Sequence, residues 1–340
     1  MLVIEKEKIN EWVKELAEKM PVIVPVRREQ QGAIESVFEK FEPRMEIDFD
    51  YLPTLLSIKE FFLPAKEYTF IFDKNSGEVQ TPPKTKPFVL FGLNSRDLEA
   101  LEQLDEIMAK PNRDFFYFEK RKPTTIIGLI NEPVSANRRT PPNGDLILIR
   151  INNEQCQAIP LTDKGRLLTK NKFFREEAAM VSSGNKSEET MPQLRQMLLD
   201  PELLSDALIW SWRQDLTVWD ELTNLCLGCG ICTYVCPLCY CFSSEDEVAL
   251  DGKTCQRCRQ WDACTLPKFS QISDGFNFHK TIRERYYNWF FHKFVRAYKE
   301  YGKSQCVACG RCQKYCPAKI DIEKYLIRIV DNYKKAMSVS

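Results

Sequence analysis

The sequence predicts an α+β protein, in which an N-terminal α/β domain precedes an α-helical, ferredoxin-like domain. Short apolar runs alternate with a segment of helical period between residues 88 and 161, which predicts strands and a helix in layers. Two cysteine runs of identical spacing lie far apart in the last third of the chain, and segments of helical period lie between them. A compact ferredoxin needs no such gap, so we expect helices to hold the second domain together.

The N-terminal elements follow from periodicity and from turn or cap residues. Apolar residues at helical spacing end before Pro21, and Asn94 or Ser95 can cap a helix after a strand closed by Gly92. A strand, a helix and a second strand in this order predict a parallel crossover, and Asn152-Asn153 predicts a hairpin. The expected helices are 9–17, 95–108 and 173–181, the expected strands are 22–26, 68–72, 88–91, 124–130, 145–151 and 155–161, and 51–63 is expected to be a packed loop.

A polar segment then separates the two halves. Residues 182–192 (SSGNKSEETMP) form the best linker in the chain. The domains are therefore expected at 1–181 and 193–340, with helices over 194–212, 282–298 and 325–336 in the second.

Composition limits the classes of function. Of 340 residues, 44% are hydrophobic and 28% are charged, which is typical of a globular protein. The 48 basic residues balance the 48 acidic ones, so bulk charge gives no reason to bind nucleic acid or an anionic membrane. The charged first twenty residues lack a signal-peptide core, and no apolar run is long enough to span a bilayer. We therefore expect a cytoplasmic protein in a reducing, anaerobic setting.

Thirteen of the fourteen cysteines fall between Cys226 and Cys316. Each run has the form C-x2-C-x2-C-x3-C-P, in which three cysteines bind one iron-sulfur cubane and the fourth ligates the other cluster. The predicted ligands of the first [4Fe-4S] cluster are Cys226, Cys229, Cys232 and Cys316, and those of the second are Cys306, Cys309, Cys312 and Cys236.

Structural zinc is the alternative to clusters. Zinc needs four ligands, usually in two separated pairs, and does not require a triplet followed by Cys-Pro. The pattern therefore favours iron-sulfur clusters.

Five further cysteines exceed what two clusters require. Cys239, Cys241 and Cys264 are expected to ligate a third centre, with Cys258 or Cys255 as the fourth ligand, and iron-sulfur is favoured over zinc. The alternative is that some of them are small apolar packing residues, which is the expectation for isolated Cys156.

Other polar residues in this half have ordinary explanations. His279 and His292 are the only histidines, and their aromatic neighbourhood favours core packing over ligation. A basic stretch is expected to be a solvated face, with charge compensation near anionic clusters as the alternative; it comprises Arg283, Arg285, Lys293, Arg296, Lys299 and Lys303.

No G-x-G-x-x-G and no Walker loop occurs. Hydride exchange with a nicotinamide is therefore not expected from this chain alone. Flavin sites exist without that motif, so a flavin-binding catalytic reductase subunit stays open as an alternative function.

Several motifs carry a resemblance to a known family. The runs CLGCGICTYVCPLCYCF and CVACGRCQKYCPAKIDI, with Trp219-Asp220 and 260–264 (QWDAC), resemble β subunits of cytosolic [NiFe] sulfhydrogenases and the iron-sulfur electron-transfer subunits of anaerobic sulfite reductases. Matches in the N-terminal half are 62–66 (FLPAK), Phe91-Gly92 with Asp97-Leu98, Ile126 to Leu129 (IIGL), and Glu132-Pro133. Cys239, Cys241 and Cys264 match the family pattern, whereas Cys255 and Cys258 do not.

The resemblance implies an electron-transfer subunit that is not catalytic on its own. Its implied partners are a subunit that binds FAD and NAD(P), and a hydrogenase small subunit or, alternatively, sulfite reductase subunits. The family's N-terminal cluster is expected to be absent, because Arg96, Asn131, Asn137 and Arg138 stand where the family has cysteines. Residues 276–278 (FNF) likewise replace the family's Gly-His-Asn.

Overall fold

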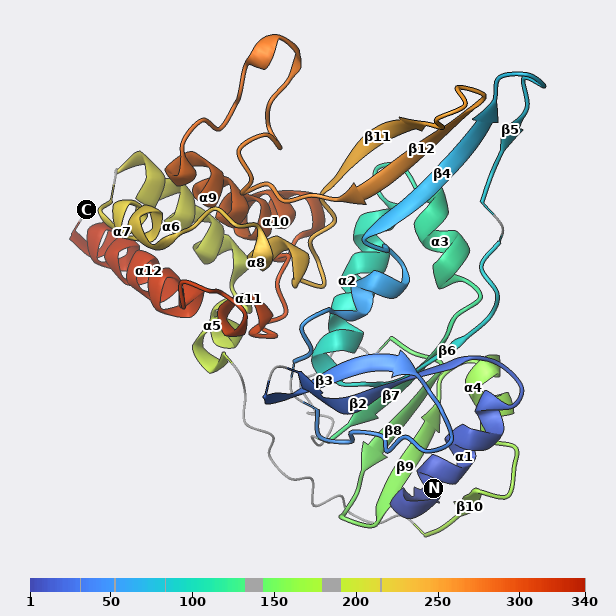
Figure 1. The fold of residues 1–340 in the computed structure, drawn as a ribbon. Coiled ribbons are helices and arrows are strands. Elements are labelled where there is room, and N and C mark those ends of the chain that lie inside the picture. The colour runs from blue at the N-terminus through green and yellow to red at the C-terminus, as the bar shows by residue number, and fades with distance from the viewer. Residues whose placement is uncertain are drawn as a thin grey trace. The chain divides into compact units, whose positions relative to one another are not determined.

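The computed structural model describes residues 1–30, 32–51, 53–82, 84–131, 143–178, 191–214 and 216–339. The chain forms two compact units, Met1–Phe62 with Lys84–Glu189, and Leu63–Pro83 with Thr190–Ser340 (Figure 1). The expected N-terminal domain, residues 1–181, included Leu63–Pro83, which the structure places in the second unit instead. The expected linker 182–192 lies outside the described residues except for Met191 and Pro192.

The first unit is built on a sheet with the strand order β10-β1-β9-β8-β7-β6-β2-β3. The central strands β8, β7, β6 and β2 are parallel neighbours, and the remaining pairs are antiparallel. The central parallel strands are almost entirely buried, as parallel strands covered on both faces are. The strands are β1 (Leu2–Glu5), β2 (Val22–Gln30), β3 (Ala33–Lys40), β6 (Val89–Leu93), β7 (Thr125–Ile130), β8 (Leu146–Arg150), β9 (Gln155–Pro160) and β10 (Phe174–Glu176).

Helices cover both faces of this sheet. On one face Trp12 of α1 packs edge-on against Phe91, with the ring centroids 6.1 Å apart. On the other face Leu98 of α2 lies so close to Gly128 that a Cβ there would meet Leu98 Cδ1 at 2.7 Å. The helices are α1 (Lys6–Ala17), η1 (Ile58–Phe61), α2 (Ser95–Ala109), α3 (Phe115–Arg121) and α4 (Asp163–Leu168).

Most N-terminal predictions are confirmed. Strand β6, helix α2 and strand β7 form the parallel crossover, and Asn94 caps α2 by accepting a hydrogen bond from Asp97 N at 2.9 Å. The β8–β9 hairpin also forms. The expected helix over 173–181 is wrong in its described part, because Phe174–Glu176 pairs with β1 as strand β10. Residues 179–181 lie outside the described part of the chain.

Helices of the second unit surround a core that also receives six of the cysteines. Trp219 is 1% exposed in this core and packs edge-on against Phe290 at 5.5 Å. The helices are α5 (Pro192–Met197), α6 (Pro201–Arg213), α7 (Val218–Leu225), α8 (Ile231–Tyr234), η2 (Ser273–Gly275), α9 (Ile282–Phe290), the π-helical η3 (Phe291–Arg296), α10 (Ala297–Tyr301), α11 (Arg311–Lys314) and α12 (Ile322–Val339). The helices expected over 194–212, 282–298 and 325–336 all form, the first interrupted between α5 and α6.

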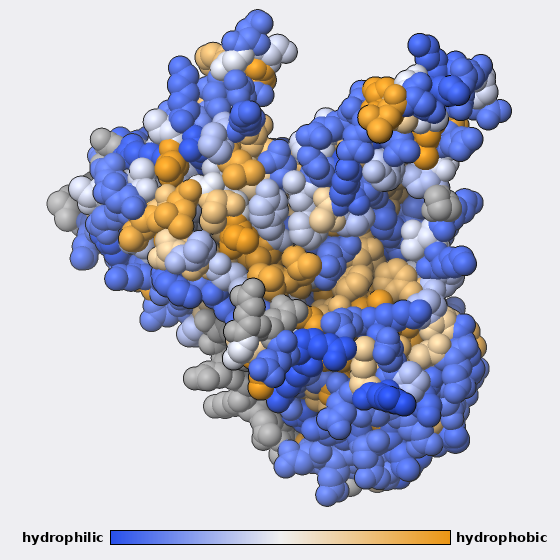
Figure 2. All heavy atoms as spheres, viewed as in Figure 1, coloured by the Kyte–Doolittle hydropathy of each residue, from blue (hydrophilic) through white to orange (hydrophobic). Residues whose placement is uncertain are grey.

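The second unit also contains a sheet that the periodicity did not predict. Strands β11 (Phe242–Val248) and β12 (Thr254–Trp261) form a hairpin, and β12 pairs with β4 (Lys66–Asp73), which pairs with β5 (Val79–Gln80). Residues 242–248 are mostly polar, so they carry no apolar alternation to mark a strand. In Figure 2 hydrophobic residues interrupt the hydrophilic surface of this sheet, where Phe72, Val79 and Val248 are exposed.

No helix among the described residues is both long enough and apolar enough to cross a bilayer.

Candidate metal centres

The two cysteine runs fold into two copies of one local structure. Gly230 and Gly310 precede the short helices α8 and α11 with φ of 80° and 75°, a left-handed conformation that favours glycine. A side chain at Gly230 would also place its Cβ 2.9 Å from the Cβ of Ala263. The third cysteine of each run, Cys232 or Cys312, therefore enters its helix at the same position.

Backbone N–H groups point at cysteine sulfurs in both copies. Gly228 N donates to Cys226 Sγ and Ala308 N donates to Cys306 Sγ, each at 3.4 Å. These two residues occupy equivalent positions, with φ of 62° and 51°. Because a thiolate accepts such bonds more strongly than a thiol, this backbone favours the form that ligates iron.

The structure brings together the four cysteines predicted for the first cluster. Cys226, Cys229, Cys232 and Cys316 line one hollow, so the last cysteine of the second run joins the triplet of the first. Cys312 also borders this hollow.

The four cysteines predicted for the second cluster line a separate hollow. Cys306, Cys309 and Cys312 come from the second run, and Cys236 comes from the first. The two hollows thus receive their cysteines in the crossed arrangement typical of two-cluster ferredoxins. The residues present fit two cubanes.

Most of these thiols lie in surroundings that disfavour free thiolates. Burial raises the pKa of Cys232 and of Cys306 to about 12, and burial also raises the pKa of Cys226 and of Cys312. Cluster assembly must therefore release protons from these sulfurs.

Lys293 is the exception in this apolar environment. It is 4% exposed, and its Nζ donates to Cys236 Sγ at 3.1 Å and to Gln305 O at 3.4 Å. Burial alone would lower the pKa of Lys293, but the nearby charges of Cys236, Cys239 and Cys306 hold it well above its ordinary value. A hydrogen bond with Cys239 and the Lys293 charge in turn lower the pKa of Cys236.

The basic stretch is therefore not simply a solvated face. Lys293 is buried against a cysteine, and Arg285, 6% exposed, donates to Thr265 O at 3.0 Å. Arg296 instead pairs with Glu300 at 2.7 Å, as an exposed residue would.

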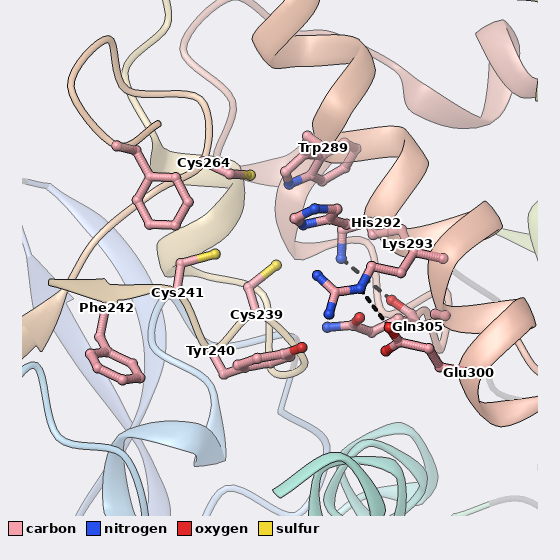
Figure 3. Close-up of a pocket in the computed structure, with 13 residues that line it drawn as sticks. Cys239, Tyr240, Cys241, Phe242, Cys264, Trp289, His292, Lys293, Glu300 and Gln305 are labelled. Atoms are coloured by element: carbon pink, nitrogen blue, oxygen red, sulfur yellow. Dashed lines mark hydrogen bonds and ion pairs between the residues drawn. The ribbon is translucent and has the colours of Figure 1, made fainter. Parts of the chain in front are cut away.

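A third cavity, of about 310 Å³, lies beside the second hollow within the same unit. Cys239, Cys241 and Cys264 line it, and their sulfurs face Trp289 and His292 across the space (Figure 3). Lys293 lines both this cavity and the second hollow.

The β11–β12 hairpin positions two of these cysteines. Cys241 precedes β11 and Cys264 follows β12, and the hairpin closes where Phe242 pairs with Trp261 and Asp262 N donates to Cys241 O at 3.0 Å. Both cysteines are thereby held at the base of the hairpin. Sequence periodicity missed this hairpin and with it the reason why these residues meet.

Two motifs that are distant in sequence meet at the same base. Trp261 N donates to Ala65 O, and Trp261 Nε1 donates to Leu63 O, each at 2.8 Å. The 62–66 and 260–264 motifs therefore share a local structural role beside Cys264.

The structure does not bring Cys258 or Cys255 to this cavity. The register places Cys258 opposite Glu245 and Cys255 opposite Val248, three and six residues up the hairpin from Phe242. At ~3.3 Å per residue, even Cys258 is removed from the base by about 10 Å. The expectation that Cys258, or alternatively Cys255, is the fourth ligand is thus wrong on geometry.

The two histidines differ in their surroundings. His292 lines the third cavity, whereas core packing was expected, and burial lowers its pKa to about 4. Its imidazole is therefore neutral at pH 7. His279 does not line this cavity, and its Nδ1 is buried without a hydrogen-bond partner.

The first unit carries a different kind of cavity, of about 540 Å³. Its lining is strongly charged, and two of its arginines are already paired, Arg27 with Asp48 at 3.2 Å and Arg28 with Glu39 at 2.6 Å. Cys156 is buried in β9 as expected, where burial raises its pKa to about 11. Asn137 and Arg138 lie outside the described residues, and neither Arg96 nor Asn131 supplies a thiolate.

Among the described residues, no three His, Cys, Asp or Glu side chains meet closely enough to hold one metal ion. The cysteines instead surround hollows, as ligands spread around a cluster do.

Two crossed sets of four cysteines define the class, an iron-sulfur protein of the dicluster type. Residues 225–320 match the family model described as a 4Fe-4S dicluster domain. The chain is 27% identical over 332 residues, 95% of its length and 96% of the relative, to sulfhydrogenase 2 subunit beta of Pyrococcus furiosus. The resemblance to sulfhydrogenase β subunits is thus confirmed. No solved structure matches the chain significantly.

Proposed function

We propose that this chain is the electron-transfer subunit of a cytoplasmic, multisubunit oxidoreductase and is not catalytic on its own. Two [4Fe-4S] clusters would be held by the crossed sets of cysteines, and each would accept and release single electrons. The observation that carries the proposal is the grouping of eight cysteines around two adjacent hollows.

In this proposal electrons pass between a subunit that binds FAD and NAD(P) and a [NiFe] hydrogenase module. The absence of a dinucleotide fingerprint supports placing the flavin on a partner. The full-length similarity to a sulfhydrogenase β subunit supports the hydrogenase partner over a sulfite reductase partner. We also propose that an N-terminal cluster is absent, since its cysteines are replaced.

The chain's own residues would tune the clusters. Backbone N–H groups at Gly228 and Ala308 stabilise negative charge on ligand sulfurs, and buried Lys293 places a positive charge beside Cys236. Each interaction favours the more reduced, more negative state of the adjacent cluster.

The crossed ligation gives a direct test. We expect anaerobically purified protein to contain about eight irons from the dicluster, with an equal amount of sulfide, and each missing ligand to perturb one cluster. Cys316→Ser and Cys226→Ser should remove the same electron paramagnetic resonance signal, whereas Cys236→Ser and Cys306→Ser should remove the other.

Cys156→Ser, in the first unit, is the matched control and should leave both signals intact. Zinc without acid-labile sulfide would overturn the proposed function. If Cys316→Ser instead abolished the signal lost in Cys306→Ser, each run would hold its own cluster.

Partner identity needs the native complex. Tagged chain isolated from its own cells without oxygen should carry hydrogen-dependent NAD(P) reduction. Copurification with a sirohaem protein and sulfite reduction would favour the sulfite reductase alternative.

A further inference from the structure

We propose that His292 is the fourth ligand of a third iron-sulfur cluster, bound by Cys239, Cys241 and Cys264 in the 310 Å³ cavity. This inference rests on the proposed function, and it replaces the Cys258 ligand that the sequence predicted. The other ligand sets need none of these four residues.

The four side chains come from three separate segments that converge on one space. Cys239 follows the first run, Cys241 and Cys264 flank the hairpin, and His292 lies on η3. Figure 3 shows the three sulfurs on one side of the cavity and the imidazole on the other. A cubane needs ligands on several sides, and this arrangement supplies them from opposite walls.

The helix that carries His292 is π-helical at this point. Segment η3 (Phe291–Arg296) interrupts a longer helix formed with α9 and α10. Such π segments often occur at functional sites because the extra residue in the turn redirects neighbouring side chains. Here the segment directs His292 into the third cavity, while Lys293 lines both that cavity and the second hollow.

A buried donor also waits at this cavity. Trp289 is 1% exposed, and its Nε1 has no hydrogen-bond partner. A buried donor without a partner is unfavourable in a folded protein. Trp289 lines the cavity, so a cluster sulfide there would be an acceptor for its N–H.

The position of the cavity gives the third cluster a role in electron transfer. Cys239 N donates to Cys236 O at 3.4 Å, and Cys236 lines the second hollow. A cluster in the cavity would therefore be the immediate neighbour of the second [4Fe-4S] cluster. It would accept one electron from that cluster and pass it onward, with no bond to substrate formed or broken.

The test uses full-length protein reconstituted with ferrous iron and sulfide without oxygen. We expect about twelve irons per chain in the parent and about eight in Cys241→Ser, with both dicluster signals retained in the variant. Cys258→Ser is the matched control and should keep the parent iron content. A parent with about eight irons, or with zinc in the cavity, would overturn this inference while leaving the dicluster function standing.

Histidine ligation has its own readout. Pulsed electron paramagnetic resonance of the reduced protein should detect a nitrogen strongly coupled to one cluster. His292→Cys should keep about twelve irons and lose that coupling, because a thiolate replaces the imidazole. His279→Gln, at the only other histidine, should keep it. Coupling that survives in His292→Cys, or disappears in His279→Gln, would contradict the assignment.

Discussion

Replacing Lys293 with methionine is expected to lower the midpoint potential of the cluster held by Cys236 and the second triplet by on the order of 100 mV. The Nζ lies 3.1 Å from Cys236 Sγ and is buried, so little water screens its charge. Reduction adds negative charge to the cluster, and a nearby cation stabilises it. Without that cation the cluster is harder to reduce. A redox titration followed by electron paramagnetic resonance measures the shift.

Lys299→Met is the matched control for the potential. Lys299 is an exposed residue of α10, so its removal changes the net charge equally but leaves the cluster surroundings unchanged. We expect a small shift there, since solvent and salt screen exposed charges. Equal shifts in the two variants would show that Lys293 does not tune the cluster. Iron content should be checked in both proteins, because Lys293 also supports the packing around Cys236.

Replacing Glu67 with alanine is expected to destabilise the β4–β12 strand pair by about 3–5 kcal/mol. Glu67 Oε1 lies 2.5 Å from Arg259 Nε, and both side chains are only 9% exposed. The substitution leaves the Arg259 charge buried without this partner. Hydrogen exchange of peptides covering β4 and β12 measures the lost protection locally, which a global unfolding curve of a two-unit protein does not.

The same hairpin offers an exposed ion pair for comparison. Arg257 and Asp246 form contacts of 2.7 Å at exposures of 49% and 47%, so Asp246→Ala should cost no more than about 1 kcal/mol. Protection that falls equally in both variants would contradict the argument from burial. Because the base of this hairpin holds Cys241 and Cys264, Glu67→Ala should also lower iron occupancy of the third cavity. The dicluster should remain filled.

Several features could be predicted from sequence because their signals are local. Cysteine spacing predicted the two sets that the structure groups around two hollows, and the Asn94 cap with its apolar stripe predicted α2. Spacing is informative here because a cubane imposes fixed distances on thiolates in one short loop. Cys239, Cys241 and Cys264 were also grouped correctly, although only the family pattern joined Cys264 to the other two.

The failures share a different physical origin. The helix expected over 173–181 gave way at Phe174–Glu176, because pairing with β1 satisfies its backbone and Phe174 packs 5.0 Å from Trp12. Polar strands β11 and β12 had no apolar alternation, and β4 was assigned to the wrong unit because nothing in its own sequence names its partner strand.

By itself the sequence determined the class of chemistry: paired thiol triplets, each closed by Cys-Pro, specify cluster binding through short-range covalent geometry. Only the tertiary structure decided which more distant residues join them. Strand register places Cys258 up the hairpin and away from Cys241, and a π-helical segment brings His292 into the cavity instead. Both depend on pairing and packing between segments far apart in the chain, which local periodicity does not encode.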